Sequence, residues 1–382
     1  MPHLRPFALV VSWLVIAATP AVRPAEAALT EGPRLAGIYG TILEARFEDA
    51  RQQLAQACPP APAEACQVLG VVALWWQIVL DPDSRHLDPR LEQAARTAIG
   101  AARAWTGREP QRAEAWFYLA AAHAPLVQWR VLRGERLAAA RDGNRIRSAL
   151  QHALALDPGL HDAQFGIGLY HYYAGVAPRA VSILRWLLLL PGGDRARGLR
   201  EMLQAREHGV LLRDEADYQL HWLYLWYERK PADAMTLLRG LDSRYPSNPI
   251  FLQRIAEVQH EYFHDHRASA DAWQSLLERA QTERVSARRL TDVRARLGLA
   301  AELVELSQTS RAVDQLTAIV AMQPSEPYGA HASAHVQLGE AYDRLGKRDL
   351  AVAAYEAALA LAPDDDPARV RARARTGLRR KF

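Results

Sequence analysis

The 382-residue sequence predicts an all-α fold, a right-handed superhelical solenoid of about eight helix pairs. Apolar residues recur at spacings of three and four positions from Leu35 to the end, which is the period of amphipathic helices. Alternation with a period of two, which is typical of strands, is almost absent. The helical segments also come in pairs, and a similar pair returns several times, as in repeat proteins.

The clearest repeat covers residues 332–365. Its characteristic residues stand at positions 7, 8, 11, 20, 24, 27 and 32 of the unit, as Leu338, Gly339, Tyr342, Ala351, Tyr355, Ala358 and Pro363. Small residues at positions 8, 20 and 27 let two helices approach closely, larger ones fill the space between them, and the proline ends the second helix. This pattern resembles the tetratricopeptide repeat, a helix–turn–helix unit, although His335 stands where the family usually has Trp.

The same register recurs in the units 161–194, 215–248 and 293–326. The segment 249–281 is a looser unit, with a one-residue insertion before Trp273. We therefore expect the solenoid to occupy residues 28–366. Residues 165–205 also resemble the tetratricopeptide-like inclusion-body-clearance family, through Gly166, Gly168, Tyr172-Tyr173 and Gly192-Gly193-Asp194-Arg195. That resemblance implies a structural role, a tight turn followed by a helix N-cap at Asp194.

Residues 1–27 have the pattern of a signal peptide. His3 and Arg5 precede an apolar run from Phe7 to Ala18, and Ala25-Glu26-Ala27 has the small-x-small form of a cleavage site. A helix of twelve residues spans about 18 Å, which is shorter than a bilayer core of about 30 Å. The sequence thus predicts a cleaved signal and a periplasmic or secreted protein, with an uncleaved membrane anchor as the alternative.

The two cysteines fit such an exported protein. Cys58 and Cys66 flank a proline-rich loop, and in an oxidising compartment they could close it as a structural disulfide. The alternative is a pair of buried thiols.

Composition and charge exclude several classes of protein. With 49% apolar and 24% charged residues, the chain is neither mainly disordered nor a collagen-like fibre nor a disulfide scaffold. Seven of the last fourteen residues are Arg or Lys, so residues 367–382 form a basic tail. Asp366 as N-cap and Pro367 at the first helical position favour a solvated terminal helix there. The alternative is an envelope-assembly factor whose basic tail contacts an anionic membrane. No aromatic residues interleave the arginines as in many nucleic-acid sites, so we expect no nucleic-acid partner.

One string looks catalytic, His260-Glu261-Tyr262-Phe263-His264, and it resembles the zinc metalloprotease motif of zincins. On one helix His260 and His264 could reach a single Zn²⁺, with Glu261 as general base and His266 as a third nitrogen. The repeat register, however, puts His264 on the turn between two helices, and no sheet is predicted to present a substrate. We therefore expect no enzyme activity and no cofactor.

The tetratricopeptide resemblance implies a different use of these residues. First helices of the repeats line a concave surface, and in related proteins positions 2, 5, 9, 12 and 13 bind extended peptides there. The matching residues are Phe165, Tyr172 and Tyr173 in one unit, Gln219, Trp226 and Tyr227 in the next, and Gln253, Glu257, His260 and Glu261 in the third. Tyr and Trp are common at binding hot spots, but they could also fill the core. The resemblance thus implies a non-catalytic scaffold or adaptor with a protein or peptide partner.

Overall fold

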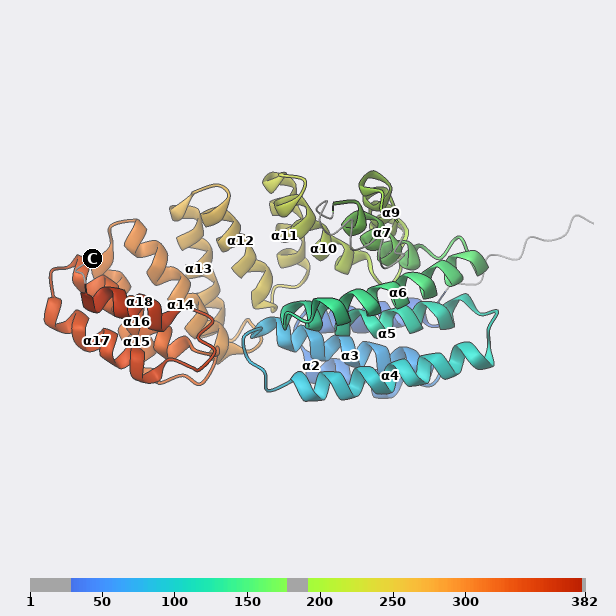
Figure 1. Cartoon of the computed structure of the whole chain (residues 1–382), viewed down its shortest axis with the longest axis horizontal. Coiled ribbons are helices and arrows are strands. Elements are labelled where there is room, and N and C mark those ends of the chain that lie inside the picture. Colours follow the sequence, from blue (N-terminus) through green and yellow to red (C-terminus); the bar gives the residue numbers. More distant parts are fainter. Residues whose placement is uncertain (1–28, 177–191, 380–382) are drawn as a thin grey trace, which may run out of the picture.

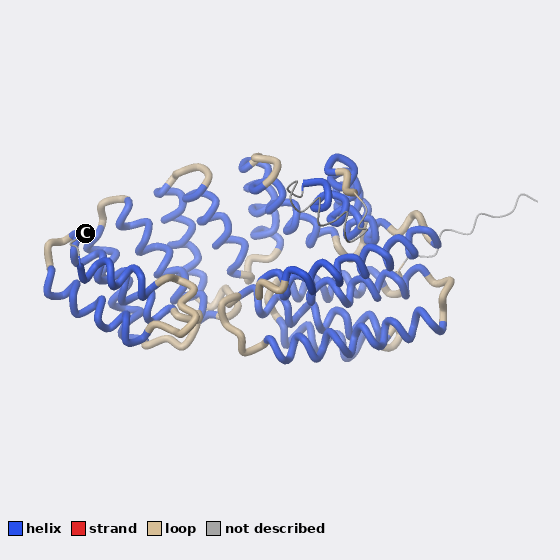
Figure 2. The backbone as a smooth tube through the Cα atoms, in the orientation of Figure 1, coloured by secondary structure: helices blue, strands red, loops and turns tan. Residues whose placement is uncertain are grey.

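The computed structural model describes residues 29–176 and 192–379, and its regular structure over these ranges is entirely helical (Figure 2). Seventeen helices in the described residues fit about eight helix pairs, so the predicted all-α solenoid is confirmed. The helices are α1 (Gly32–Leu43), α2 (Phe47–Ala57), α3 (Ala63–Leu80), α4 (Asp88–Arg108), α5 (Ala113–Leu132), α6 (Arg136–Leu156), α7 (His161–Val176), α9 (Arg195–His208), α10 (Arg213–Trp226), α11 (Pro231–Arg244), α12 (Pro249–Glu261), α13 (His266–Gln281), α14 (Arg288–Glu305), α15 (Thr309–Met322), α16 (Ala330–Arg344), α17 (Arg348–Leu361) and α18 (Val370–Arg379).

Consecutive helices pack against each other along the whole described chain, and the array curves (Figure 1). The predicted signal segment, residues 1–27, lies outside the described residues, as do Ala180, Leu184 and Leu187 of the unit that begins at His161. In the structure α9 packs closely against α7: a Cβ atom added at Gly168 would lie 2.8 Å from the carbonyl oxygen of Gly198. Asp194 caps α9 as expected, because its side chain accepts a hydrogen bond from the Arg197 N–H.

The small residues of the repeat pattern act as predicted where two helices meet. A Cβ atom added at Gly339 would lie 2.4 Å from the ring of Tyr355, which is fully buried between α16 and α17. At Gly298 of α14 the same test gives 2.3 Å to the ring of Trp273 on α13. At these two contacts the close approach of the helices therefore depends on a glycine opposite an aromatic ring.

The first helices of the chain pack against helices that lie much later in the sequence. Figure 1 shows α2–α5 beside the lower ends of α10 and α12. Trp76 of α3 packs on Tyr218 of α10 with a ring-centroid distance of 4.8 Å, and it also contacts Phe251 of α12. One hydrophobic core therefore joins helices α1–α6 to the N-terminal ends of α10 and α12.

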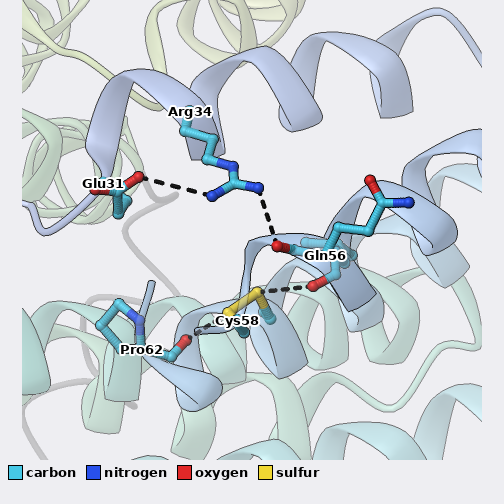
Figure 3. The surroundings of a disulfide bond; sticks show 7 residues. Glu31, Arg34, Gln56, Cys58 and Pro62 are labelled. Carbon is cyan, nitrogen blue, oxygen red and sulfur yellow. Dashed lines mark hydrogen bonds and ion pairs between the residues drawn. A yellow bond between two sulfur atoms is a disulfide. The ribbon is translucent and has the colours of Figure 1, made fainter. Parts of the chain in front are cut away.

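The predicted disulfide is present, and it joins Cys58 at the end of α2 to Cys66 in the first turn of α3 (Figure 3). Beside it, the Arg34 guanidinium donates a hydrogen bond of 2.9 Å to the backbone oxygen of Gln56. The disulfide and this contact hold the first three helices together.

Among the described helices, α3 is long and apolar enough to cross a membrane, by length and composition alone. Most of it, 61%, is buried inside the protein, where Trp76 belongs to the core. Its apolar character is therefore accounted for by its central place among α1, α4 and α5.

The basic segment at the C-terminus is folded as far as residue 379. Asp366 accepts hydrogen bonds from the N–H groups of Val370 and Arg371, and helix α18 begins at Val370 rather than at Pro367. Arg373 makes a double hydrogen bond to Glu340 of α16, at 2.9 and 2.6 Å. Helix α18 thus covers the end of the last repeat.

Candidate functional site

Five aromatic side chains lie together at the C-terminal ends of α7, α10 and α12, and we call this group the aromatic surface. Its members are Tyr173, Trp222, Trp226, Tyr227 and Tyr262. Trp226 is 56% exposed, while Tyr173 and Tyr227 are each 38% exposed, which is unusual for side chains of this size.

The two tryptophans form a fixed platform within this surface. The rings of Trp222 and Trp226 lie 4.4 Å apart with an angle of 31° between their planes, because the residues are one helical turn apart on α10. The Arg254 guanidinium lies over the Trp222 ring, 4.8 Å from its centroid. The Tyr262 hydroxyl at the end of α12 lies next to Trp226, so the surface extends from α10 to α12.

Tyrosine rings extend the surface toward α7. Tyr227 meets Tyr173 edge to face at 5.8 Å, and both rings cover Tyr172. Tyr172 is fully buried, and its hydroxyl donates a hydrogen bond to Glu228, which also accepts two hydrogen bonds from Arg195. Burial, together with the Glu228 carboxylate, raises the pKa of Tyr172 above its ordinary value. Tyr172 therefore supports the surface from beneath.

An ion pair and a buried neutral histidine lie close to the two tryptophans. Arg254 pairs with Glu257 on α12. His221 is completely buried, and burial, reinforced by the Arg254 charge, lowers its pKa to about 3. This imidazole is consequently neutral at physiological pH, and its Nδ1 group bonds the backbone oxygen of Tyr218.

The predicted binding residues separate into an exposed and an inaccessible set. Trp226, Tyr227, Tyr173, His260 and Glu261 are exposed, at positions 12 and 13 of their units. Tyr172 also stands at position 12, but it is fully buried beneath its neighbours. The prediction that it lies on the accessible surface is therefore wrong.

Residues at position 5 are mostly inside the protein. Phe165 is only 6% exposed and packs in the core with α10 side chains, and Gln253 is buried. Gln219 is half-buried and donates a hydrogen bond to Glu215. Helices α1 and α3 cover the beginning of α10 and α12, whereas the ends of these helices stay open. Glu257, in the middle of α12, is half-buried in its pair with Arg254.

The structure separates the two histidines of the zincin-like string. Helix α12 ends at Glu261, and His264 lies exposed on the following turn with a φ of 54°. This agrees with the register argument, and it leaves His260 and His264 on different elements. His260 and His266 instead face Glu302 of α14. The Nδ1 atom of His260 lies 2.9 Å from Oε1 of Glu302, and the Nδ1 atom of His266 lies 2.9 Å from Oε2.

Three residues of these sites were not predicted from the sequence. Trp222 stands four positions before Trp226, so the helical period offered a signal for it. Glu302 interrupts the apolar face formed by Leu299 and Leu303, and a buried carboxylate on such a face calls for a partner. Nothing in the local pattern distinguishes Tyr262 from a core aromatic residue.

Comparison with known proteins agrees with this architecture. Residues 332–365 match the tetratricopeptide repeat family. No curated protein matches the sequence.

Two kinds of solved structure are similar to the chain. One is the APC/C hetero-tetramer Cut9–Hcn1, at 13% identity and a TM-score of 0.49, over 89% of this chain and 53% of the matched chain, so this protein spans about half of that length. Another is the human IFIT1 dimer with m7Gppp-AAAA, at 11% identity and a TM-score of 0.44, over 92% and 86% of the two chains. Residues 332–365 thus form a tetratricopeptide repeat, and the helix pairs that precede them continue the all-helical array.

Proposed function

We propose that this protein is an exported, non-catalytic scaffold or adaptor that binds an extended segment of a protein or peptide partner on its aromatic surface. Folds of this repeat type commonly mediate protein interactions. The observation that carries the proposal is the exposure of Trp226, whose ring packs against Trp222 and lies next to Tyr262 instead of being buried.

A rigid, exposed tryptophan is well suited to binding. Covering a large aromatic side chain removes much apolar area from water, and little side-chain entropy is lost when the ring is already fixed. The indole N–H and the tyrosine hydroxyls could in addition bond to a peptide backbone. The surface thus combines apolar area with polar groups at its edges, which is the composition of a binding hot spot.

An extended partner fits the layout of the surface. Tyr173, Trp226 and Tyr262 come from the ends of α7, α10 and α12, three first helices of successive repeats. An extended chain advances about 3.3 Å per residue, so a segment of a few residues can contact side chains from more than one of these helices. The ligand class is therefore a short extended peptide with apolar side chains.

Two features support export. The segment 1–27 has the charge, apolar run and cleavage pattern of a secretory signal, and the Cys58–Cys66 disulfide suits an oxidising compartment. The two alternatives, a zinc metalloprotease and an envelope-assembly factor with a membrane-contacting basic tail, have less support. His264 lies off the helix that carries His260, and Arg371 and Arg373 of the basic tail are occupied with the backbone of Pro363 and with Glu340.

The proposal is tested with a displayed library of random extended peptides selected on the purified protein. Peptides that bind should lose at least about tenfold in affinity to Trp226→Ala, because hot-spot truncations cost about 2 kcal/mol or more. Calorimetric titration of individual synthetic peptides measures the change.

Leu137→Ala is the matched control, since Leu137 is a 68% exposed apolar side chain on α6. Its affinity for the selected peptides should equal that of the unmodified protein. Selected peptides that bind Trp226→Ala as tightly as the unmodified protein would place the binding site elsewhere.

A further inference from the structure

Three side chains from successive helices meet next to the end of α12. They are His260 in its last turn, His266 at the first position of α13, and Glu302 on α14. One possible ligand atom from each residue lies within 4.8 Å of the other two. Among the described residues, this is the group of His, Cys, Asp and Glu side chains whose spacing suits a metal ion.

The carboxylate at the centre of this group lacks a permanent cation. Glu302 is only 3% exposed, and within residues 29–176 and 192–379 it pairs with the two histidines and with no arginine or lysine. A buried carboxylate is costly unless a positive charge compensates it. A divalent ion would supply a fixed positive charge at this carboxylate.

The distances are close to those that a metal requires. Zinc lies about 2.0–2.1 Å from imidazole nitrogen and carboxylate oxygen, so neighbouring ligand atoms in a tetrahedron are roughly 3.3 Å apart. The nitrogen–oxygen separations here are 2.9 Å. The two contacts involve different oxygens of Glu302, Oε1 for His260 and Oε2 for His266. A metal ion that replaces the two N–H protons and binds both oxygens therefore needs each nitrogen–oxygen pair to open by about 0.4 Å.

The donor set also restricts the kind of metal. Two imidazole nitrogens and one carboxylate oxygen favour Zn²⁺, Co²⁺, Ni²⁺ or Cu²⁺ over Mg²⁺ and Ca²⁺, which prefer all-oxygen sites. His260 is 45% exposed, so solvent can reach the group and complete the coordination with water.

We infer that His260, His266 and Glu302 form a binding site for a divalent transition-metal ion. The ion would fasten the turn between α12 and α13 to α14, next to Tyr262 of the aromatic surface. This assignment replaces His264, which is exposed on the turn, by Glu302, and it concerns a structural ion. It is independent of the proposed peptide binding, because none of its three ligands belongs to the aromatic surface.

The test uses untagged full-length protein freed of metal with a chelator. Zn²⁺ binding is measured by calorimetry, and Co²⁺ binding by its visible absorption, which reports nitrogen and oxygen ligation. One ion should bind per chain. His266→Ala and Glu302→Gln should each weaken binding by at least about tenfold, since each removes one of three protein ligands.

Two control variants separate this site from other histidines. His264→Asn, at a backbone position that asparagine tolerates, and the double variant His331→Ala/His335→Ala, which removes the neighbouring pair on α16, should both bind as the unmodified protein does. Circular dichroism of each metal-free variant checks its folding.

The inference is wrong if the unmodified protein binds no Zn²⁺ at micromolar concentrations. It is equally wrong if folded His266→Ala retains full affinity, or if affinity is lost in either control variant. None of these results bears on the peptide affinity of Trp226→Ala, so each proposal can be refuted without refuting the other.

Discussion

The Tyr39 hydroxyl donates a hydrogen bond of 2.8 Å to the carboxylate of Glu215, which lies 176 positions later in the chain. Both groups are buried, and burial raises the pKa of each, with the neighbouring Glu215 charge adding to the effect on Tyr39. This bond joins α1 to the first turn of α10, so the N-terminal helices are part of the structure that carries the aromatic surface.

Tyr39→Phe should therefore lower the free energy of unfolding by about 1–3 kcal/mol, because a buried acceptor loses its donor while the ring volume is kept. Tyr245→Phe is the matched control, since its hydroxyl bonds the partly exposed Asp214. Urea unfolding should show the smaller loss for the control. Equal losses would mean that the Tyr39–Glu215 hydrogen bond contributes no more to the free energy of unfolding than the more exposed Tyr245–Asp214 bond.

Asn248 makes a second connection between the two parts of the chain. Its side chain is fully buried, caps α12 at the Ile250 N–H, and donates a hydrogen bond of 2.7 Å to the Leu43 carbonyl at the end of α1. Asn248→Ala loses the cap and leaves that carbonyl unsatisfied, so we expect a loss of about 2–4 kcal/mol.

The neighbouring Ser247→Ala serves as the control for Asn248. Ser247 Oγ contacts Glu44 at 3.2 Å near the surface, and its loss should cost under about 1 kcal/mol. Thermal unfolding of both variants compares them. If Asn248→Ala is as stable as Ser247→Ala, the α1–α12 contact contributes little.

Contacts within one repeat could be predicted from the sequence. The register that places Gly339 opposite Tyr355 depends on residues less than one repeat apart, and the disulfide spans eight positions. Local periodicity and spacing contain this information. Trp226 and Tyr227 are exposed at positions 12 and 13, as the resemblance implied, but Tyr172 at the same position 12 is buried, so position alone does not decide exposure.

Contacts between distant repeats could not be predicted in the same way. The pairs Tyr39–Glu215 and Asn248–Leu43 arise because the curvature of the array brings helices 176 and 205 positions apart together. That curvature is the sum of small rotations between repeats, which no single motif encodes. The same curvature covers the beginning of α10 and α12. For this reason the sequence alone could not show that Gln253, an expected binding residue, is buried.

Close helix packing at Gly339 leads to a third prediction. A Cβ atom there would lie 2.4 Å from Tyr355, whose ring also meets Gly377 of α18 and cannot move away. Gly339→Ala should therefore destabilise the protein by about 1–3 kcal/mol, although alanine is the better helix former.

The control for this prediction is Gly100→Ala. Gly100 lies in the exposed part of α4, where an added Cβ atom would have no neighbour within 4 Å. This change should stabilise the protein by up to about 1 kcal/mol. Chemical denaturation of both variants should thus give changes of opposite sign, and a stabilising Gly339→Ala would contradict the packing argument.

Buried histidines make stability depend on pH. Burial lowers the pKa of His221 to about 3 and that of His123 to about 4, and nearby arginines act in the same direction. The unfolded chain, with imidazole pKa values near 6.5, binds more protons than the folded protein below that pH. Stability from these groups is therefore complete above about pH 6.5 and is lost as the pH falls toward the folded-state values.

His221→Asn should remove its share of this dependence, which is about 2 kcal/mol at pH 5. Between pH 7 and pH 5 the variant should lose less stability than the unmodified protein, and comparing the two cancels the opposite contribution of Glu215, whose pKa is raised by burial. Urea unfolding at several pH values measures the slopes. The control His264→Asn, at an exposed turn, should show the same dependence of stability on pH as the unmodified protein. If His221→Asn also shows the dependence of the unmodified protein, His221 is not held neutral in the folded state.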